Sequence, residues 1–232
     1  MKKNRFIIGF IFLIFFKFSF AQNKQIQISF LGTFGQNNLS LTDSVFDTKD
    51  SNQLQIETLK FYISNVQLLN NGKLVLEEKN SFYLVDIAEK NPFKISLQNN
   101  NNIVFDKIKF NIGIDSFTNV SGAMGGDLDP TKGMYWTWQN GYINFKLEGK
   151  SQVCKTRNNE FQFHLGGYQF PNYSMQTISF LVNNSEKIQI NIDVQKILHQ
   201  IDLSKTNQIM SPSVEAVLLT KIVANAFSIS GN

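Results

Sequence analysis

The sequence predicts an all-β protein, an antiparallel β-sandwich of about ten strands with a C-terminal α-helix. Two observations lead to this prediction. Apolar and polar residues alternate with a period of two through much of the chain, which is typical of strands with one face on a core and one in water. The one long helical pattern begins after Ser211 and Pro212, near the C-terminus. Many strands with little helix favour a sandwich.

The predicted strands are short and follow one another along the chain. Strict alternation predicts strands at 107–115, 142–148, 161–165 and 187–193. Less regular segments predict further strands at 25–32, 58–68, 73–76, 82–87, 93–97 and 177–182. Asn71 and Gly72 lie between two of these segments and indicate a hairpin turn. A short helix is expected at 194–200, and a capped amphipathic helix at 214–227, with Pro212 near its first turn.

The first 21 residues have the pattern of a cleavable signal peptide. A basic start precedes the apolar run 6–16, and the small residues Ser19 and Ala21 stand at positions −3 and −1 before the expected cleavage point. The apolar run is too short for a bilayer, which needs roughly 20 apolar residues, and Lys17 interrupts it. We therefore expect export to the periplasm or the cell surface, without a membrane-spanning segment.

Removing this leader changes the charge of the protein. The whole chain carries 22 Lys and Arg against 18 Asp and Glu, a formal charge of +4. The leader holds four basic residues and no acidic one, so the mature chain, residues 22–232, has 18 of each and is neutral. The basic balance thus belongs to the targeting segment, and nucleic-acid binding is excluded as a class. We expect the mature chain to form a single domain.

One glycine-rich segment, residues 116–139, lies between two predicted strands and does not alternate. It contains both tryptophans of the protein, Trp136 and Trp138. Long loops on a rigid β scaffold are frequent binding sites, so this segment is the first candidate for function. The structural alternative is a loop that folds back and closes one end of the sandwich with Tyr135 and the two tryptophans.

The remaining candidate residues give weaker signals. Asp127 and Asp129 are two apart and could hold a calcium ion, although Asx-turns give them an ordinary structural role. The histidines are His164 and His199, and alternation places His164 on the strand face away from the core, which leaves its ring nitrogens free for a ligand or solvent. The sequence has no recognisable catalytic constellation, so we do not expect an enzyme.

The run 127–149 resembles the MbnP-like family of exported copper-binding proteins. Further segments agree with that family, namely 59–66, 84–86, 110–115, 163–168 and 209–212. The resemblance extends over nearly the whole mature chain, and the tryptophan-containing run is its most specific part. The family is similar to MopE and CorA, surface copper proteins of methane-oxidising bacteria.

The resemblance implies a copper site with an unusual ligand. In those relatives copper is bound by histidines and by a tryptophan oxidised to kynurenine, and a partner di-haem enzyme of the MbnH type, related to MauG, performs the oxidation. By this resemblance Trp136 stands at the modified position and His164 at the downstream histidine. One histidine and one kynurenine are a poor donor set for copper, which Met134 or a backbone group could complete. Trp138 stands where the relatives have their first histidine. Which tryptophan is oxidised therefore stays open. It also stays open whether this branch of the family has kept the loop and lost the metal.

Two functions follow as expectations. The first is an exported, non-catalytic copper-binding protein that carries a kynurenine made by a di-haem partner enzyme. The alternative is a secreted interaction module that binds a glycan or a protein through its tryptophan loop, with structural calcium.

Overall fold

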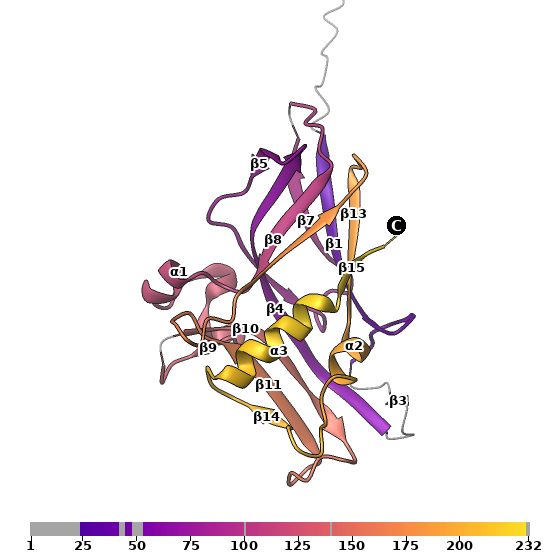
Figure 1. Ribbon diagram of the computed structural model, residues 1–232, viewed down its shortest axis with the longest axis vertical. Coiled ribbons are helices and arrows are strands. Elements are labelled where there is room, and N and C mark those ends of the chain that lie inside the picture. Colours follow the sequence, from indigo (N-terminus) through magenta and orange to yellow (C-terminus); the bar gives the residue numbers. More distant parts are fainter. Residues whose placement is uncertain (1–23, 42–44, 48–52, 100, 140, 231–232) are drawn as a thin grey trace, which may run out of the picture.

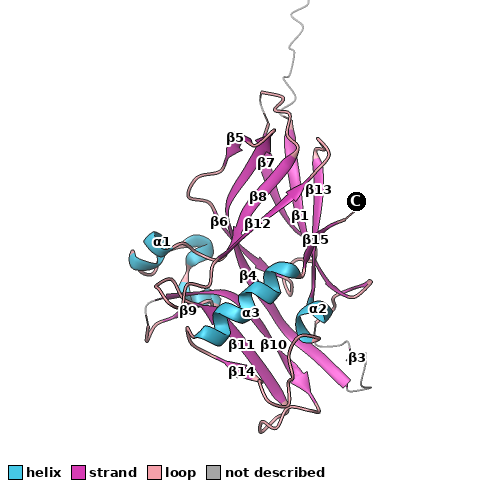
Figure 2. Cartoon of the chain, viewed as in Figure 1, coloured by secondary structure: helices cyan, strands magenta, loops and turns pink. Residues whose placement is uncertain are grey.

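The computed structural model describes residues 24–41, 45–47, 53–99, 101–139 and 141–230 (Figure 1). Two β-sheets form the body of the protein, and helices lie at its sides (Figure 2). The predicted leader lies outside the described residues. Within the described ranges, each helix is too short or too polar to cross a membrane.

The smaller sheet is organised around β1 (Gln25–Phe34). Strand β13 (Lys187–Asp193) pairs with β1 in parallel, and β7 (Phe93–Gln98) and β2 (Asn37–Asn38) pair with it in the antiparallel sense. Strand β15 (Phe227–Ile229) extends the sheet beyond β13. Alternate residues of β1, such as Ile26 and Ile28, are completely buried, as the period of two predicts.

The larger sheet has the long strand β4 (Gln53–Asn70) near its centre. Its strand order is β12 (Gln176–Leu181), β8 (Lys107–Ile112), β4, β10 (Gly141–Ser151), β11 (Glu160–Gly166) and β14 (Gln208–Ile209). Four further strands pair with β4 or β10, namely β3 (Val45–Asp47), β5 (Lys73–Glu77), β6 (Phe82–Asp86) and β9 (Tyr135–Trp136).

The larger sheet divides at Tyr62 of β4. Along one edge of β4, the residues up to Phe61 pair with β10, and the residues from Ile63 onward pair with β8. The side chain of Asn144 fills the fork between β8 and β10, where its Oδ1 accepts a hydrogen bond from the backbone N–H of Ile114 at 2.9 Å. Gly113 is required beside it, because its φ is +108° and a Cβ there would lie 2.4 Å from the Asn144 amide carbon. This fork is where residues 116–139 leave the sheet.

The core between the two sheets is rich in phenylalanine. Phe30 of β1 packs edge-on against Phe61 and Phe110 of the larger sheet, with ring centroids 6.3 and 5.5 Å apart. Phe227, the first residue of β15, packs edge-on against Phe61, with ring centroids 5.6 Å apart. Such perpendicular aromatic pairs are favourable beyond the area that they bury.

Two helices close the side of the sandwich. Helix α2 (Val194–Leu198) follows β13 directly, and helix α3 (Val214–Asn225) lies against β11 and β12 (Figure 2). The Ser213 hydroxyl begins α3 by accepting a hydrogen bond from the N–H of Ala216 at 3.1 Å. One side of α3, including Leu219 and Val223, is buried.

The predicted sandwich and C-terminal helix are confirmed. The hairpin turn is confirmed as well, since Asn71 and Gly72 both have positive φ between β4 and β5. Two pairings are parallel, β1 with β13 and β11 with β14, which alternation does not predict because side chains alternate in both kinds of pairing. Helix α3 ends at Asn225 rather than at residue 227, because Phe227 begins β15.

Candidate functional site

Residues 116–139 cover part of the outer face of the larger sheet, the face turned away from the core. The segment contains helix α1 (Ser116–Val120), the 3₁₀ turns η1 (Gly126–Leu128) and η2 (Pro130–Lys132), and β9. It encloses a second apolar cluster whose buried members are Tyr62, Leu84, Ile114, Leu128, Met134, Trp136, Tyr142 and Ile143. The loop is therefore a packed structure, in agreement with the structural alternative, and it brings Met134 and Trp136 inside.

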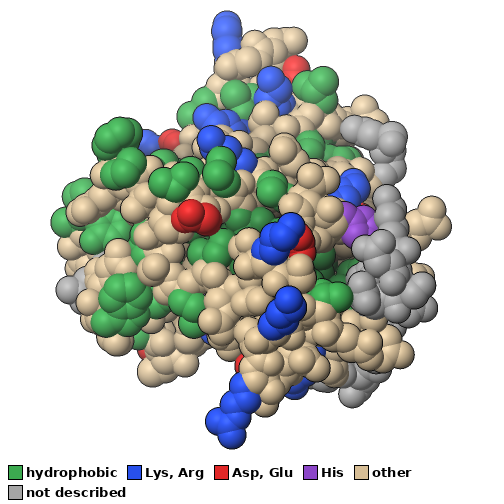
Figure 3. Space-filling model, turned by 60° about the horizontal axis from the view of Figure 1, so that its bottom comes forward, with side chains coloured by type: hydrophobic (Ala, Val, Ile, Leu, Met, Phe, Trp, Pro, Cys, Tyr) green, Lys and Arg blue, Asp and Glu red, His purple; other side chains and the backbone are tan. Residues whose placement is uncertain are grey.

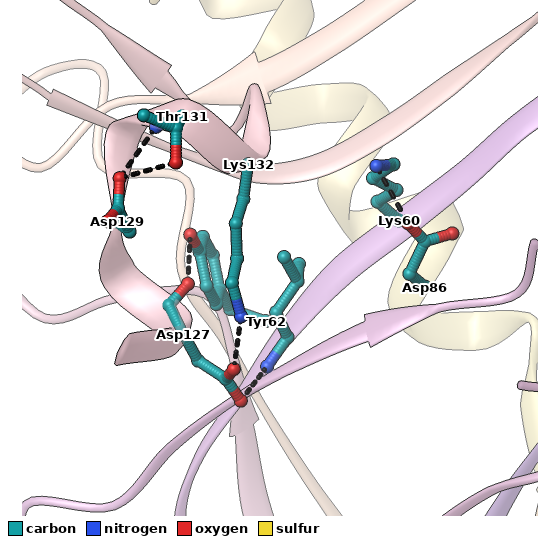
Figure 4. Close-up of polar contacts among 8 residues, drawn as sticks. Lys60, Tyr62, Asp86, Asp127, Asp129, Thr131 and Lys132 are labelled. Atoms are coloured by element: carbon teal, nitrogen blue, oxygen red, sulfur yellow. Dashed lines mark hydrogen bonds and ion pairs between the residues drawn. The ribbon is translucent and has the colours of Figure 1, made fainter. Parts of the chain in front are cut away.

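Asp127 makes three contacts, of which two anchor this loop to the sheet and one lies within the loop (Figure 4). Its carboxylate accepts a hydrogen bond from the N–H of Leu84 at 3.0 Å and lies 2.6 Å from the Lys132 ammonium. Its backbone carbonyl accepts a hydrogen bond from the Tyr62 hydroxyl at 3.0 Å. Burial raises the pKa of Tyr62, and the phenol of Tyr142 and the carboxylate of Asp127 raise it further. Tyr62 thus stays a neutral donor at the centre of the cluster.

Asp129 lies on the exposed side of the loop and serves a local turn. Its Oδ1 accepts hydrogen bonds from the backbone N–H and the hydroxyl of Thr131 at 2.8 and 2.7 Å (Figure 4), and these bonds lower its pKa. This is the Asx-turn role that the sequence offered as the alternative to calcium. Asp127 and Asp129 bind different partners within the chain, and calcium at these two residues stays a prediction.

Trp136 is nearly buried, with 6% of its surface exposed, and lies on the outer face of β11. Strand β9 pairs Trp136 with Gly141 of β10. A Cβ at Gly166 would lie 2.6 Å from Cζ3 of the indole, so the ring occupies the space that a side chain would fill at position 166. Gly166 therefore allows the indole to lie directly on the strand.

His164 precedes Gly166 by two residues and therefore shares the strand face that carries Trp136. The sequence prediction placed His164 on this outer face and expected its ring nitrogens to be free, which is wrong for Nε2. The residue is 7% exposed, and its Nε2 lies 2.6 Å from Oε1 of Glu148 on β10. The loop 116–139 covers part of this outer face, so some of its side chains are buried. Alternation does not predict the position of that loop.

The contact with Glu148 determines which nitrogen of His164 carries a proton. Burial raises the pKa of Glu148, but hydrogen bonds from His164 and Thr58 and the charge of Lys146 outweigh it, and the pKa falls to about 2. An ionised carboxylate only accepts hydrogen bonds, so Nε2 of His164 carries the proton and donates it. In the neutral imidazole Nδ1 then keeps a lone pair. None of the described residues donates a hydrogen bond to that lone pair.

The charged groups around this pair are themselves partnered. Lys146 lies 3.6 Å from Oε1 of Glu148 and donates to the carbonyl of Gly133 at 3.4 Å, which ties the tryptophan loop to β10. On the same outer face, Lys60 of β4 forms an ion pair with Asp86 of β6 at 2.7 Å (Figure 4).

The other sequence candidates divide between the interior and the surface. Met134 is completely buried two residues before Trp136, and its carbonyl accepts a hydrogen bond from Ile143 at 2.9 Å. Trp138 is 66% exposed, and its ring centroid lies 6.0 Å from that of Trp136. His199 is exposed at the C-terminal end of α2, away from the loop. The structure therefore packs Met134 and Trp136 into one buried cluster, places His164 on the strand face that carries Trp136, and leaves the other candidates outside.

Sequence reasoning missed two residues of this site, Glu148 and Gly166. Glu148 lies 16 residues before His164, and its role depends on the register in which β10 pairs with β11. Its signal was its position on the outward face of a predicted strand. Gly166 could have been noticed as a glycine at the end of a strand, where the backbone closely approaches another group.

The fold and the site define a class of protein: an all-β sandwich whose outer sheet face carries a packed tryptophan loop beside a carboxylate-paired histidine. The MbnP family model matches residues 23–211, and the chain belongs to the MbnP family. Among solved structures, MbnP from Methylosinus trichosporium is similar, with a TM-score of 0.65 and 11% sequence identity over 90% of this chain and 98% of that one. At this identity the likeness concerns the fold. None of the curated proteins compared with the chain matches it.

Proposed function

We propose that this chain is an exported, non-catalytic copper-binding protein whose ligands come from His164, Met134 and an oxidised Trp136. The observation that carries the proposal is the Glu148–His164 pair beside Trp136. Metal-binding histidines almost always donate their second ring N–H to a carboxylate or a carbonyl, which orients the ring and leaves the other nitrogen for the metal. Glu148 provides that partner at 2.6 Å.

The donor set agrees with copper in its chemistry. An imidazole nitrogen and a thioether sulfur suit copper(I), which favours soft and nitrogen donors. An indole only donates a hydrogen bond, whereas kynurenine would supply an aryl amine and a ketone as donors. Among the described residues there is no group of three or more His, Cys, Asp and Glu side chains that could hold a metal. The donors other than His164 therefore have to come from Met134, a backbone group or a modified tryptophan.

The proposal includes the partner and the compartment. Kynurenine formation requires an oxidising enzyme, and a di-haem protein of the MbnH type is the partner that family membership suggests. The leader predicted over residues 1–21 would bring the chain to the periplasm or the cell surface, and the proposed partner enzyme would have to meet it there.

The test uses protein purified from its native host. Copper content is measured together with peptide mapping of the two tryptophans, and both are repeated for His164→Ala, Met134→Leu and the control His199→Ala. We expect copper in the wild type and in the His199 variant, a modified Trp136, and loss of copper in the His164 variant. Unmodified tryptophans together with copper-free wild-type protein would refute the proposal, and unchanged copper in His164→Ala would remove His164 from the site.

One observation favours a second candidate, an interaction module for a glycan or a protein. Around the loop, Phe117, Val120, Trp138 and Phe170 are all more than half exposed. On the face drawn in Figure 3, hydrophobic side chains gather on the left, the side on which Figure 1 places α1. Exposed apolar surface of this kind is common at interaction sites. Glycan-array or pull-down binding that is lost in Trp138→Ala, in a protein without copper, would favour this candidate.

A further inference from the structure

The two tryptophans form a contact that joins the protein surface to the buried site. Their ring centroids are 6.0 Å apart and their planes are inclined by 48°. Trp138 is 66% exposed and Trp136 only 6%. Within the described residues, Trp136 makes its one aromatic ring contact with Trp138. An oxidant approaching from solvent therefore meets Trp138 first.

This geometry matters because the indole that has to be oxidised is covered. Direct attack on Trp136 would require the loop to open, and Asp127 and Lys146 hold that loop to the sheet. An electron can leave a buried ring without such opening, provided that a second oxidisable ring lies in contact with it. Indole is among the most easily oxidised side chains, and electron transfer between rings in contact is fast compared with transfer over longer gaps.

We propose, on the basis of the function proposed above, that Trp138 is an electron relay to Trp136. A high-potential one-electron oxidant at the surface takes one electron from the indole of Trp138 and is itself reduced by one electron. The radical cation of Trp138 then takes one electron from Trp136, which restores Trp138 and leaves the radical cation on Trp136. The indole N–H proton of Trp136 passes to water. No bond between heavy atoms forms or breaks in these steps.

The neighbouring tyrosines offer a less suitable route. The ring of Tyr135 packs on Tyr142 with centroids 4.9 Å apart, and Tyr142 packs on Tyr62 at 5.9 Å. This line runs beneath the loop and does not include the indole of Trp136. Oxidation of a phenol near neutral pH requires loss of its proton, and burial raises the pKa of Tyr142 and of Tyr62. Tyr135 is therefore a matched control. It is an oxidisable ring next to Trp136 in sequence, but its ring contacts Tyr142 and not Trp136.

The test uses unmodified full-length mature protein made without the partner enzyme, so it does not depend on copper. Photogenerated tris(bipyridine)ruthenium(III), with a cobalt(III) complex as the final electron acceptor, serves as the one-electron oxidant in air-saturated buffer. Peptide mapping measures the rate at which Trp136 gains oxygen in the wild type, Trp138→Phe, Trp138→Tyr and Tyr135→Phe. Acrylamide quenching of fluorescence in Trp138→Phe, which retains only Trp136, verifies that this indole stays covered.

We expect oxygen uptake at Trp136 to fall at least tenfold in Trp138→Phe, to recover partly in Trp138→Tyr, and to stay at the wild-type rate in Tyr135→Phe. A wild-type rate in Trp138→Phe with Trp136 still covered would overturn the relay, as would an equal loss in Tyr135→Phe. Copper-free native protein with intact tryptophans would instead overturn the proposed function, and the photochemical result would stand.

Discussion

Glu148 and His164 face each other on neighbouring strands, with Oε1 and Nε2 2.6 Å apart, and the pair lies at the edge of the tryptophan loop. The register of β10 and β11 places Lys146 directly opposite His164 and Glu148 opposite Gln162. The contact is therefore diagonal, which lets Glu148 orient the imidazole while Lys146 holds the loop. Histidine orientation and loop position thus depend on two residues, Lys146 and Glu148, that lie two positions apart on one strand.

Replacing Glu148 with Gln is expected to weaken copper binding. The neutral amide is a weaker acceptor than the ionised carboxylate, so it no longer fixes the orientation of the His164 ring. Loss of such a partner typically lowers metal affinity by about 10–100-fold. Competition with a copper(I) chelator measures the change. Glu57→Gln is the matched control, since Glu57 pairs with Lys150 at 2.5 Å on the neighbouring part of the sheet. Equal affinities of Glu148→Gln and the wild type would contradict this role.

The same substitution should change how stability depends on pH. The folded-state pKa of Glu148 is about 2, below its ordinary value of 4.5, so the ionised group stabilises the folded protein above pH 4.5. That contribution is lost as the pH falls through the folded-state pKa. Urea unfolding should show the wild type more stable than Glu148→Gln near neutral pH, with the difference shrinking between pH 4.5 and pH 2. A difference that stays constant over this range would contradict the assignment.

Gly166→Ala should destabilise the fold and displace the indole of Trp136. The new Cβ would lie 2.6 Å from both the indole and the carbonyl oxygen of Tyr142, and the backbone atom cannot easily move away. Overpacking of this kind typically costs about 1–3 kcal/mol. Urea unfolding followed by tryptophan fluorescence measures both effects. Gly125→Ala is the control, since a Cβ there meets nothing within 4 Å and the φ of −90° suits alanine.

Asp127→Ala should loosen the loop more than Asp129→Ala. Asp127 accepts a hydrogen bond from the N–H of Leu84, and leaving a buried backbone group unpaired costs about 1–3 kcal/mol. Asp129 bonds only within its own exposed turn, to Thr131. Hydrogen exchange at Leu84 and the thermal midpoint measure the difference. A midpoint that rises with added calcium in the wild type, but not in either variant, would establish the calcium site predicted from the sequence.

Much of the fold could be predicted from local patterns. Strict alternation in 107–115 and 187–193 predicts two strands correctly, because a strand between core and water requires a period of two. The first of them is shorter than predicted, since β8 ends at Ile112, just before Gly113 with its φ of +108°. The turn at Asn71 and Gly72 was predictable because a two-residue hairpin needs positive φ at both positions. The absence of alternation in 116–139 correctly indicated a segment with a different role.

The environment of His164 shows where local patterns end. Alternation identified the face on which His164 lies, but not what covers that face. His164 is only 7% exposed, and Glu148 reaches it only in the observed strand register. Interactions between residues distant in sequence leave no periodic trace, so the sequence did not predict that Glu148 would occupy Nε2.

The residue types of this chain were therefore enough to establish its sandwich class, the tryptophan loop as the candidate site and the family resemblance. They could not distinguish Trp136 from Trp138, since both are tryptophans two positions apart in one loop. Packing makes that distinction: Gly166 leaves room for the indole of Trp136 on β11, whereas Trp138 stays at the surface 6.0 Å away. The physical reason is that burial depends on the neighbour across the sheet, and strand register selects that neighbour.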